Sequence, residues 1–148
     1  MIPSTLTLSE ARSAESKGAL ARIPAGELTM GAKTNALLNA GPRHRVSVRA
    51  FELAIVPVTV AEYALFLRET AHETPRDWSL PRFSDPRQPV VGVSWFDAAA
   101  YLSWISDETG VRVRLPTEAE REWAALGGRD VEFPWGEAPL DRAGPLSR

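Results

Sequence analysis

Apolar residues recur at helical spacing in three stretches of the chain. In each stretch, residues at positions i, i+3, i+4 and i+7 form a largely apolar set, which is typical of a helix that buries one face. The three sets are Val60, Tyr63, Ala64 and Leu67, then Trp95, Ala98, Ala99 and Leu102, then Ala119, Glu122, Trp123 and Leu126. The pattern therefore predicts three amphipathic helices between residues 60 and 126.

Each predicted helix begins with a capping box, in which a hydroxyl residue stands three positions before an acid. The hydroxyl accepts from the amide at the acid, and the acid accepts from the amide of the hydroxyl residue. The pairs are Thr59 with Glu62, Ser94 with Asp97 and Thr117 with Glu120. We expect structural roles for these residues, and a weaker reciprocal bond from Asp97 because aspartate is shorter than glutamate. The helices are predicted to end near Ala71, Gly110 and Gly127.

Shorter apolar runs predict strands. Residues 20–31 contain two runs separated by a turn signal at Pro24-Ala25-Gly26. Residues 44–56 alternate and then change phase, which indicates two short strands or one bent strand. A further short strand is expected at 111–114. Residues 72–93 hold four prolines and two aromatic side chains, which favours a long but ordered loop.

Length and composition set broad limits. A chain of 148 residues is typical of one domain, which we place at residues 20–148 after a flexible tail at residues 1–19. The net charge of -2 does not favour a nucleic-acid partner. No run approaches the roughly 20 apolar residues that span a bilayer, so no membrane partner is expected. The polar N-terminus lacks the features of a secretory signal, so the expected location is cytoplasmic.

Candidate catalytic chemistry is sparse. The sequence contains no cysteine and only two histidines, His44 and His72, whose spacing does not suggest a metal site. Glu118 and Glu122 share a helix face, but Glu120 points elsewhere and is already assigned to a cap. We therefore expect no catalytic residue, no metal ligand and no cofactor within this chain.

The tryptophans and one arginine are the remaining residues of interest. Trp95, Trp104 and Trp123 fall on helical faces and are expected in the core. Trp78 lies in the long loop and Trp135 between proline and glycine, so these two are the candidates for contact with a ligand or peptide. Arg114 is expected to pair with a carboxylate inside the fold as part of the structural motif.

Several segments, in order, resemble the formylglycine-generating-enzyme or sulfatase-modifying-factor superfamily. The resemblance covers roughly residues 20–136. Its most specific segment is Arg114-Leu115-Pro116-Thr117-Glu118-Ala119-Glu120. The other segments are Gly26 to Gly31, which resembles an opening hairpin, Pro57-Val58-Thr59 with Glu62-Tyr63, Pro89 to Ala98 with Tyr101 and Trp104, and Phe133-Pro134-Trp135-Gly136.

The resemblance implies an α+β fold of the C-type-lectin-like sulfatase-modifying-factor kind, with much irregular chain. Formylglycine generators of this superfamily oxidise a cysteine in a sulfatase peptide, using copper held by two cysteines. Other members make sulfoxides with iron, and some bind ligands without known catalysis. A Gly-Asn-Val-Trp-Glu-Trp segment of the family contributes to a calcium site.

This sequence lacks the family's redox cysteines and its Gly-Asn-Val-Trp-Glu-Trp segment. We therefore expect a truncated or split N-terminal half of the domain, incomplete in fold and inactive alone. A C-terminal half or a second polypeptide would complete it, and copper, iron or calcium would belong only to a complete member. The alternative is a non-catalytic lectin-like module that binds a protein or peptide through residues 72–93. An enzyme that acts alone through carboxylates and arginine is the third reading.

Overall fold

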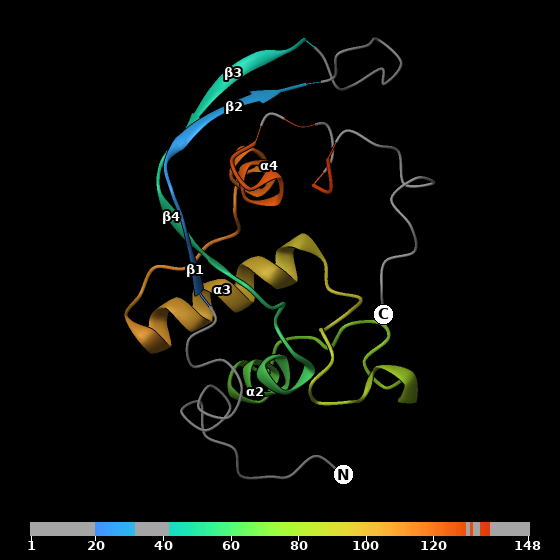
Figure 1. Cartoon of the computed structure of the whole chain (residues 1–148). Helices are drawn as coiled ribbons and strands as arrows, with labels where there is room; N and C mark the ends of the chain where they lie inside the picture. The colour runs from blue at the N-terminus through green and yellow to red at the C-terminus, as the bar shows by residue number, and fades with distance from the viewer. Residues whose placement is uncertain (1–19, 32–41, 130, 132–133, 137–148) are drawn as a thin grey trace. The chain divides into compact units, whose positions relative to one another are not determined.

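The computed structural model describes residues 20–31, 42–129, 131 and 134–136, and these residues form strands followed by helices (Figure 1). The predicted α+β class is confirmed. The predicted tail at 1–19 and Phe133 of the last family segment lie outside the described residues. The elements are β1 (Leu20–Ile23), β2 (Gly26–Met30), β3 (His44–Val48), β4 (Phe51–Ala54), α2 (Val60–Thr70), the 3-10 helix η1 (Pro81–Phe83), α3 (Trp95–Thr109) and α4 (Glu118–Leu126).

The chain divides into two compact units, and each unit is interleaved in sequence with the other. The helical unit comprises Met1–Ala21 and Ala54–Leu115, which include α2, η1 and α3. The strand unit comprises Arg22–Leu53 and Pro116–Arg148, which include β2, β3 and α4. Each unit has a hydrophobic cluster of its own, so we describe them separately.

All three predicted capping boxes are present at the starts of the helices. The N-cap amide donates to the acid at 2.8 Å in α2, at 2.7 Å in α3 and at 2.7 Å in α4. The expectation of a weaker reciprocal bond from Asp97 is therefore wrong. The cap amide of Ser94 lies as close to the shorter aspartate as the other cap amides lie to their glutamates.

The helices also end where the sequence predicts. Gly110 and Gly127 follow α3 and α4 with φ of 67° and 60°, a left-handed conformation that glycine adopts at low cost. The helix α2 ends at Ala71, which has a φ of 53° without being a glycine. The amide of Ala71 donates to the carbonyl of Leu67 at 3.0 Å, which closes the last turn.

The strands pair differently from the expected opening hairpin. β2 pairs antiparallel with β3, with Leu28 opposite Val46, and β1 pairs with β4 in a separate two-stranded sheet. The turn signal at residues 24–26 therefore carries the chain from one sheet to the other, and does not join two paired strands. The phase change in residues 44–56 is confirmed as the break between β3 and β4.

The core of the strand unit forms between β2, β3 and α4. Its buried members are Leu28, Met30, Val48, Trp123 and Leu126. The Trp123 indole Nε1–H donates to the Pro24 carbonyl at 2.8 Å, across 99 positions of sequence. A methyl group on Gly26 would lie 2.2 Å from Cζ2 of the same ring, so only glycine allows the indole this close to the strand.

The core of the helical unit is mainly aromatic and forms between α2 and α3. Tyr63, Phe66, Tyr101 and Ile105 are buried, and Trp78 and Trp104 pack partly buried against them. The edge of Phe66 meets both tyrosine rings, at centroid distances of 5.2 and 5.6 Å. The expected burial of Trp104 and Trp123 is supported, since Trp104 is half-buried and Trp123 buried.

The predicted strand at residues 111–114 is not formed. The hydroxyl of Ser106 on α3 accepts from the Val113 amide at 2.9 Å and lies 3.3 Å from the Val113 carbonyl oxygen. A side chain thus takes the backbone groups that a neighbouring strand would otherwise satisfy. The alternating valines predicted an extended segment, but the backbone partner is a helix side chain.

The long loop at residues 72–93 is held along its second half. Thr59 and Pro89 form an isolated antiparallel bridge, and the Val90 amide donates to the Val58 carbonyl at 2.9 Å. The Val60 amide donates to the Gln88 carbonyl, also at 2.9 Å. The last of these bonds uses an amide at the start of α2, which has no partner within the helix. The second half of the loop is therefore hydrogen-bonded to the start of α2 and the residues just before it.

Candidate functional site

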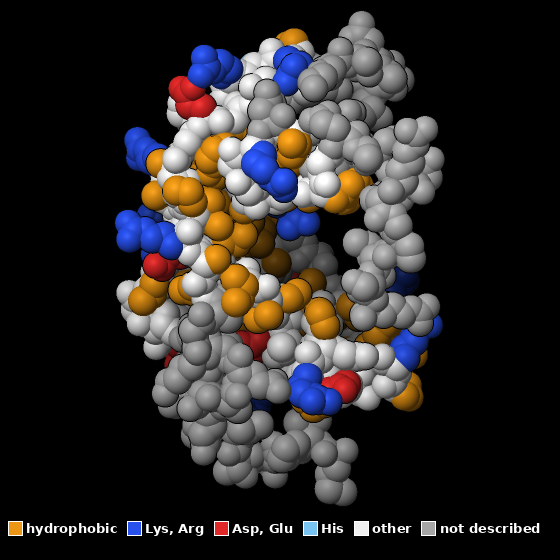
Figure 2. All heavy atoms as spheres, in the orientation of Figure 1, with side chains coloured by type: hydrophobic (Ala, Val, Ile, Leu, Met, Phe, Trp, Pro, Cys, Tyr) orange, Lys and Arg blue, Asp and Glu red, His pale blue; other side chains and the backbone are white. Residues whose placement is uncertain are grey.

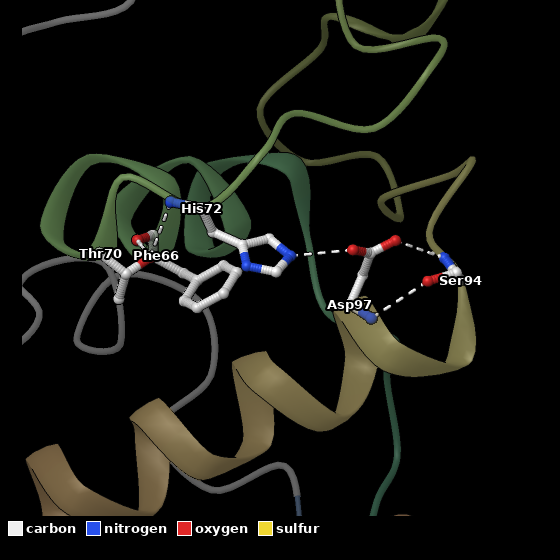
Figure 3. Close-up of polar contacts among 5 residues, drawn as sticks. All are labelled: Phe66, Thr70, His72, Ser94 and Asp97. Atoms are coloured by element: carbon white, nitrogen blue, oxygen red, sulfur yellow. Dashed lines mark hydrogen bonds and ion pairs between the residues drawn. The ribbon is translucent and has the colours of Figure 1, made fainter.

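A hydrogen-bonded pair, His72 and Asp97, lies beside the aromatic cluster of the helical unit. His72 follows the C-terminus of α2, and Asp97 lies in the first turn of α3. Figure 3 shows the two side chains pointing toward one another from these two helices, with His72 Nε2 2.8 Å from Asp97 Oδ1. Both side chains are roughly a quarter exposed to solvent, at 28% and 25%. The pair thus links the end of one helix to the beginning of the next.

Asp97 is held as a carboxylate by three hydrogen-bonding groups. The His72 ring has the largest effect, followed by the side chain and the backbone of Ser94, and together they lower the pKa of Asp97 to about 2. The Ser94 amide donates to Oδ2 at 2.7 Å, and the Asp97 amide donates to Ser94 Oγ at 3.2 Å. The carboxylate also lies at the positive end of α3, where the helix dipole favours an anion.

The backbone around His72 is fixed by its own contacts. The His72 amide lies 3.3 Å from Thr70 Oγ1, and that hydroxyl donates to the Phe66 carbonyl at 2.7 Å. The imidazole ring packs on the Phe66 ring with centroids 5.0 Å apart. Ring position and backbone position are therefore both set by the last turn of α2.

The hydroxyl of Tyr63 is the one buried side-chain polar atom without a hydrogen-bond partner among the described residues. Burial raises the pKa of Tyr63 to about 12, with a second contribution from the negative charge of Asp97. The phenol therefore stays neutral at physiological pH. A buried hydroxyl without a partner typically costs about 1–3 kcal/mol, so this group lowers the stability of the cluster.

The aspartate–histidine arrangement has a recognisable chemical capacity. A carboxylate that accepts from one imidazole nitrogen fixes the ring orientation and leaves the other nitrogen available for a proton. Among the described residues, no hydrogen bond is found for His72 Nδ1. The same contacts equally connect the end of α2 to the first turn of α3 as a structural link.

Sequence reasoning identified Asp97 as a cap but did not identify its partner. His72 and Asp97 are 25 positions apart, and the intervening loop gives no pattern that pairs them. Tyr63 was predicted only as part of an apolar helix face. Its orphan hydroxyl depends on which rings surround it, which no spacing in the sequence reveals.

Two neighbouring aromatic side chains of α3 are exposed, contrary to expectation for one of them. Trp95 is 66% exposed and Phe96 77% exposed, and their rings meet edge to face at 5.3 Å. Trp95 was expected in the core, and this expectation is wrong. The buried residues of α3 are Tyr101 and Ile105, which lie later in the helix. Trp95 is in the first turn and does not point in their direction, so their packing does not cover it. Figure 2 shows hydrophobic side chains at the surface where α3 lies in Figure 1.

The predicted contact residues lie in different units. Trp78 belongs to the helical unit, is half-buried, and its ring centroid lies 5.9 Å from that of Tyr63. Trp135 belongs to the strand unit and is 43% exposed. Their contact with a ligand or peptide stays a prediction. Arg114 is exposed and donates to the Leu115 carbonyl at 2.9 Å, which differs from the expected position inside the fold.

The described part of the chain contains neither a group of potential metal ligands nor a membrane-spanning helix. Within residues 20–31, 42–129, 131 and 134–136, no three His, Cys, Asp or Glu side chains are grouped as metal ligands would be. Over the same residues, no helix has the length and apolar character needed to cross a membrane.

Comparison with known proteins identifies the family. The model of the sulfatase-modifying factor enzyme 1-like domain matches residues 5–146, nearly the whole sequence. The chain belongs to the sulfatase-modifying-factor family. PvdO from Pseudomonas aeruginosa, a solved structure, is similar at 30% identity with a TM-score of 0.66, over 87% of this chain and 54% of its own. The fold of the sulfatase-modifying-factor chain is therefore that of its family.

Two curated relatives show the range of this family. A hercynine oxygenase of Mycolicibacterium smegmatis is 30% identical over 78% of this chain and 34% of its own length. A formylglycine-generating enzyme of Streptomyces coelicolor is 31% identical over 78% of this chain and 50% of its own length. The sulfatase-modifying-factor chain thus spans between a third and a half of these relatives.

The metals implied by the family do not fit the residues at hand. A copper site built from two cysteines cannot form, because the sequence contains no cysteine. The two histidines belong to different units, and His72 already pairs with Asp97. No step of metal chemistry is therefore assigned to these side chains.

Proposed function

We propose that these residues are the N-terminal scaffold of an oxidative sulfatase-modifying-factor domain, and that the redox residues lie in further polypeptide. One observation carries the proposal. The family model matches nearly the whole sequence, yet the sequence has no cysteine for thiolate chemistry. The relatives are two to three times as long as the part that is matched, so there is ample length for the redox residues elsewhere.

The interior of the described residues supports a scaffold role. None of the buried residues in the described part of the chain is polar or charged by class, apart from the tyrosine hydroxyls. Two apolar clusters, one in each unit, support capped helices and short strands. The His72–Asp97 pair is the exception, and it lies where it can position the first turn of α3.

The further polypeptide is proposed as the C-terminal part of a sulfatase-modifying-factor domain, in the same gene product or in a second one. The reaction proposed for the completed domain oxidises a cysteine side chain of a peptide to an aldehyde, with copper or iron supplied by the added part. The C–S bond breaks and the sulfur leaves as hydrogen sulfide. Dioxygen is reduced to water by four electrons, two from the cysteine and two from an added thiol that becomes a disulfide. No nucleic acid or membrane takes part, and the expected cytoplasmic location stays a prediction.

The test is an oxidation assay with two samples. The 148-residue chain is incubated with copper, dioxygen, a thiol reductant and a cysteine peptide, alone and together with the C-terminal half of the Streptomyces coelicolor enzyme made as a separate polypeptide. Peptide mass spectrometry measures the aldehyde product. We expect no product from the chain alone and product from the mixture.

Two controls make this assay decisive. The C-terminal half alone must give less product than the mixture, or the chain contributes nothing. Product from the 148-residue chain alone would refute the proposal, since the catalytic residues would then lie within it.

A second candidate is a non-catalytic module that binds a protein or peptide through residues 72–93. The bonds that tie this loop to the start of α2 favour it, because a preorganised loop loses less freedom on binding. A monomeric chain with one cooperative unfolding transition, and no gain from the added half, would favour this reading.

A further inference from the structure

We propose that a series of oxidisable rings in the helical unit carries single electrons between the loop at residues 72–93 and helix α3. In order, the rings are those of Trp78, Tyr63, Tyr101 and Trp104. We call this series the ring path. The inference goes beyond the proposed function, because it concerns electron transfer through this chain alone and does not require the further polypeptide.

The first argument is the spacing of the rings. The ring centroids of Trp78 and Tyr63 are 5.9 Å apart. Those of Tyr63 and Tyr101 are 5.7 Å apart, and these two rings stack with an angle of 23° between their planes. The centroids of Tyr101 and Trp104 are also 5.7 Å apart. Each ring therefore lies against the next, which is the arrangement in which an electron passes most readily from one π system to another.

The second argument is the chemistry of these side chains. Tryptophan and tyrosine are the side chains that most readily lose a single electron in a sequence without cysteine. Phe66 contacts Tyr63, Tyr101 and Trp104, but a phenyl ring is far harder to oxidise. Phe66 therefore packs against the ring path without being part of it.

The third argument is the difference between the ends and the middle of the path. Trp78 and Trp104 are half-buried, whereas Tyr63 and Tyr101 are buried. The Tyr63 hydroxyl has no hydrogen-bond partner among the described residues, so no group there accepts its proton. An oxidised phenol persists only after it has lost that proton. The electron deficiency therefore passes through Tyr63 and settles on a tryptophan, whose indole N–H can release its proton to water.

The overall step balances with an oxygen-centred radical as oxidant and a thiol as reductant. The radical takes one electron from Trp104 and one proton from water, and becomes the corresponding hydroxyl compound. Electrons move one ring along the path, so that Trp78 finally lacks one electron and gives its indole proton to water. A thiol then returns a hydrogen atom to Trp78, and two thiyl radicals couple to a disulfide. The ring path thus lets a thiol at one end quench a radical formed at the other.

The experiment starts an oxidation at one end of the path and measures where it arrives. Because the sequence has no cysteine, Glu108→Cys provides a single thiol to which a ruthenium(II) photosensitiser is attached. Glu108 is exposed on α3, four positions after Trp104 and therefore beside it on the helix surface. Light and a cobalt(III) quencher convert the ruthenium(II) to ruthenium(III), which takes one electron from Trp104. Peptide mass spectrometry then measures oxygenated products at each tryptophan.

The test variant adds Tyr63→Phe and Tyr101→Phe to the labelled chain, which keeps both rings but removes their capacity to be oxidised. We expect products at Trp78 and Trp104 in the labelled chain. In the variant we expect the loss of most of the Trp78 product and a gain at Trp104. Trp95, which is 66% exposed on the same helix, reports oxidant that escapes into solution, and its oxidation should stay unchanged.

The matched control is Phe66→Leu in the labelled chain, which disturbs the same cluster but removes a ring outside the path. It should keep the Trp78 product. Loss of that product in the control as well would mean that packing, and not the tyrosines, governs the result, and would overturn the inference.

Two further outcomes would also overturn it. Equal Trp78 product with and without the tyrosine hydroxyls would show that the tyrosines do not carry the electron. Absence of Trp78 product in the labelled chain would show that the oxidation stops at Trp104. Neither result bears on peptide oxidation by the completed domain, so the ring path and the proposed function are tested separately.

Discussion

The two units are stabilised in different ways. In the strand unit, Trp123 joins α4 to the start of β2. Its ring packs against Gly26, and its indole N–H donates to the Pro24 carbonyl, 99 positions away in sequence. The helical unit distributes its contacts over many rings between α2 and α3, and leaves two other rings exposed. A single close contact makes a unit sensitive to any added atom, whereas a cluster is sensitive mainly to the loss of its central ring.

Removing the central ring of the helical unit should give the largest effect. Phe66 is 1% exposed and touches two tyrosines, a tryptophan and His72, so Phe66→Ala should lower the free energy of unfolding by about 3–5 kcal/mol. Hydrogen exchange measured by mass spectrometry should show the loss mainly in α2 and α3. The same change at the half-buried Phe83 is the control and should cost far less. Equal costs would mean that the cluster has no central ring.

Adding one methyl group to the strand unit should give the next largest effect. Gly26→Ala places Cβ 2.2 Å from the Trp123 ring, so the ring or the strand must move, at a cost of about 1–3 kcal/mol. The indole N–H signal of Trp123 in a proton–nitrogen NMR spectrum should shift as its bond to Pro24 changes.

Gly110→Ala, in the helical unit, is the control for that change. It meets no atom within 4 Å, but it carries a positive φ, so only backbone strain of about 1 kcal/mol is expected. The Trp123 signal should not move. If Gly26→Ala also leaves that signal in place, the close contact does not govern the strand unit.

The smallest effect concerns the carboxylate that joins α2 to α3. His72→Gln removes the largest cause of the low pKa of Asp97, so that pKa should rise from about 2 toward the ordinary 3.8. A carbon NMR titration of the Asp97 carboxyl measures it. His44→Gln, in the strand unit, should leave the titration unchanged.

The sign of the linked pH effect follows from the direction of this shift. Because folding lowers the pKa of Asp97, its contribution to stability is present above the unfolded value and is lost as pH falls through about 2. His72→Gln should reduce that acid dependence. An unchanged pKa in the variant would show that Ser94 alone holds the carboxylate.

Local chemistry predicted most of the secondary structure. The three helix starts, their ends and the break near Ala50 were read from the sequence, because caps and glycine stops act over a few residues. The prediction of a strand at residues 111–114 is wrong, because local propensity does not account for tertiary contacts. The Val113 amide donates to the side chain of Ser106 on α3, and this partner cannot be inferred from the strand propensity of residues 111–114.

The candidate site was less accessible to prediction. Asp97 was found as a cap, but its bond to His72 and the orphan hydroxyl of Tyr63 depend on how α2 and α3 pack. The predicted burial of Trp95 is wrong for the same reason. Its helical spacing predicted burial, but the face it occupies has no partner in the described part of the helical unit.

The sequence by itself determined the family, the helix boundaries and the lack of thiolate chemistry, because these depend on residue identity and short spacing. The tertiary structure decided which strands pair, which rings are buried and which carboxylate meets His72. Those outcomes depend on contacts between residues 25 to 99 positions apart, and such contacts form only once the chain has folded.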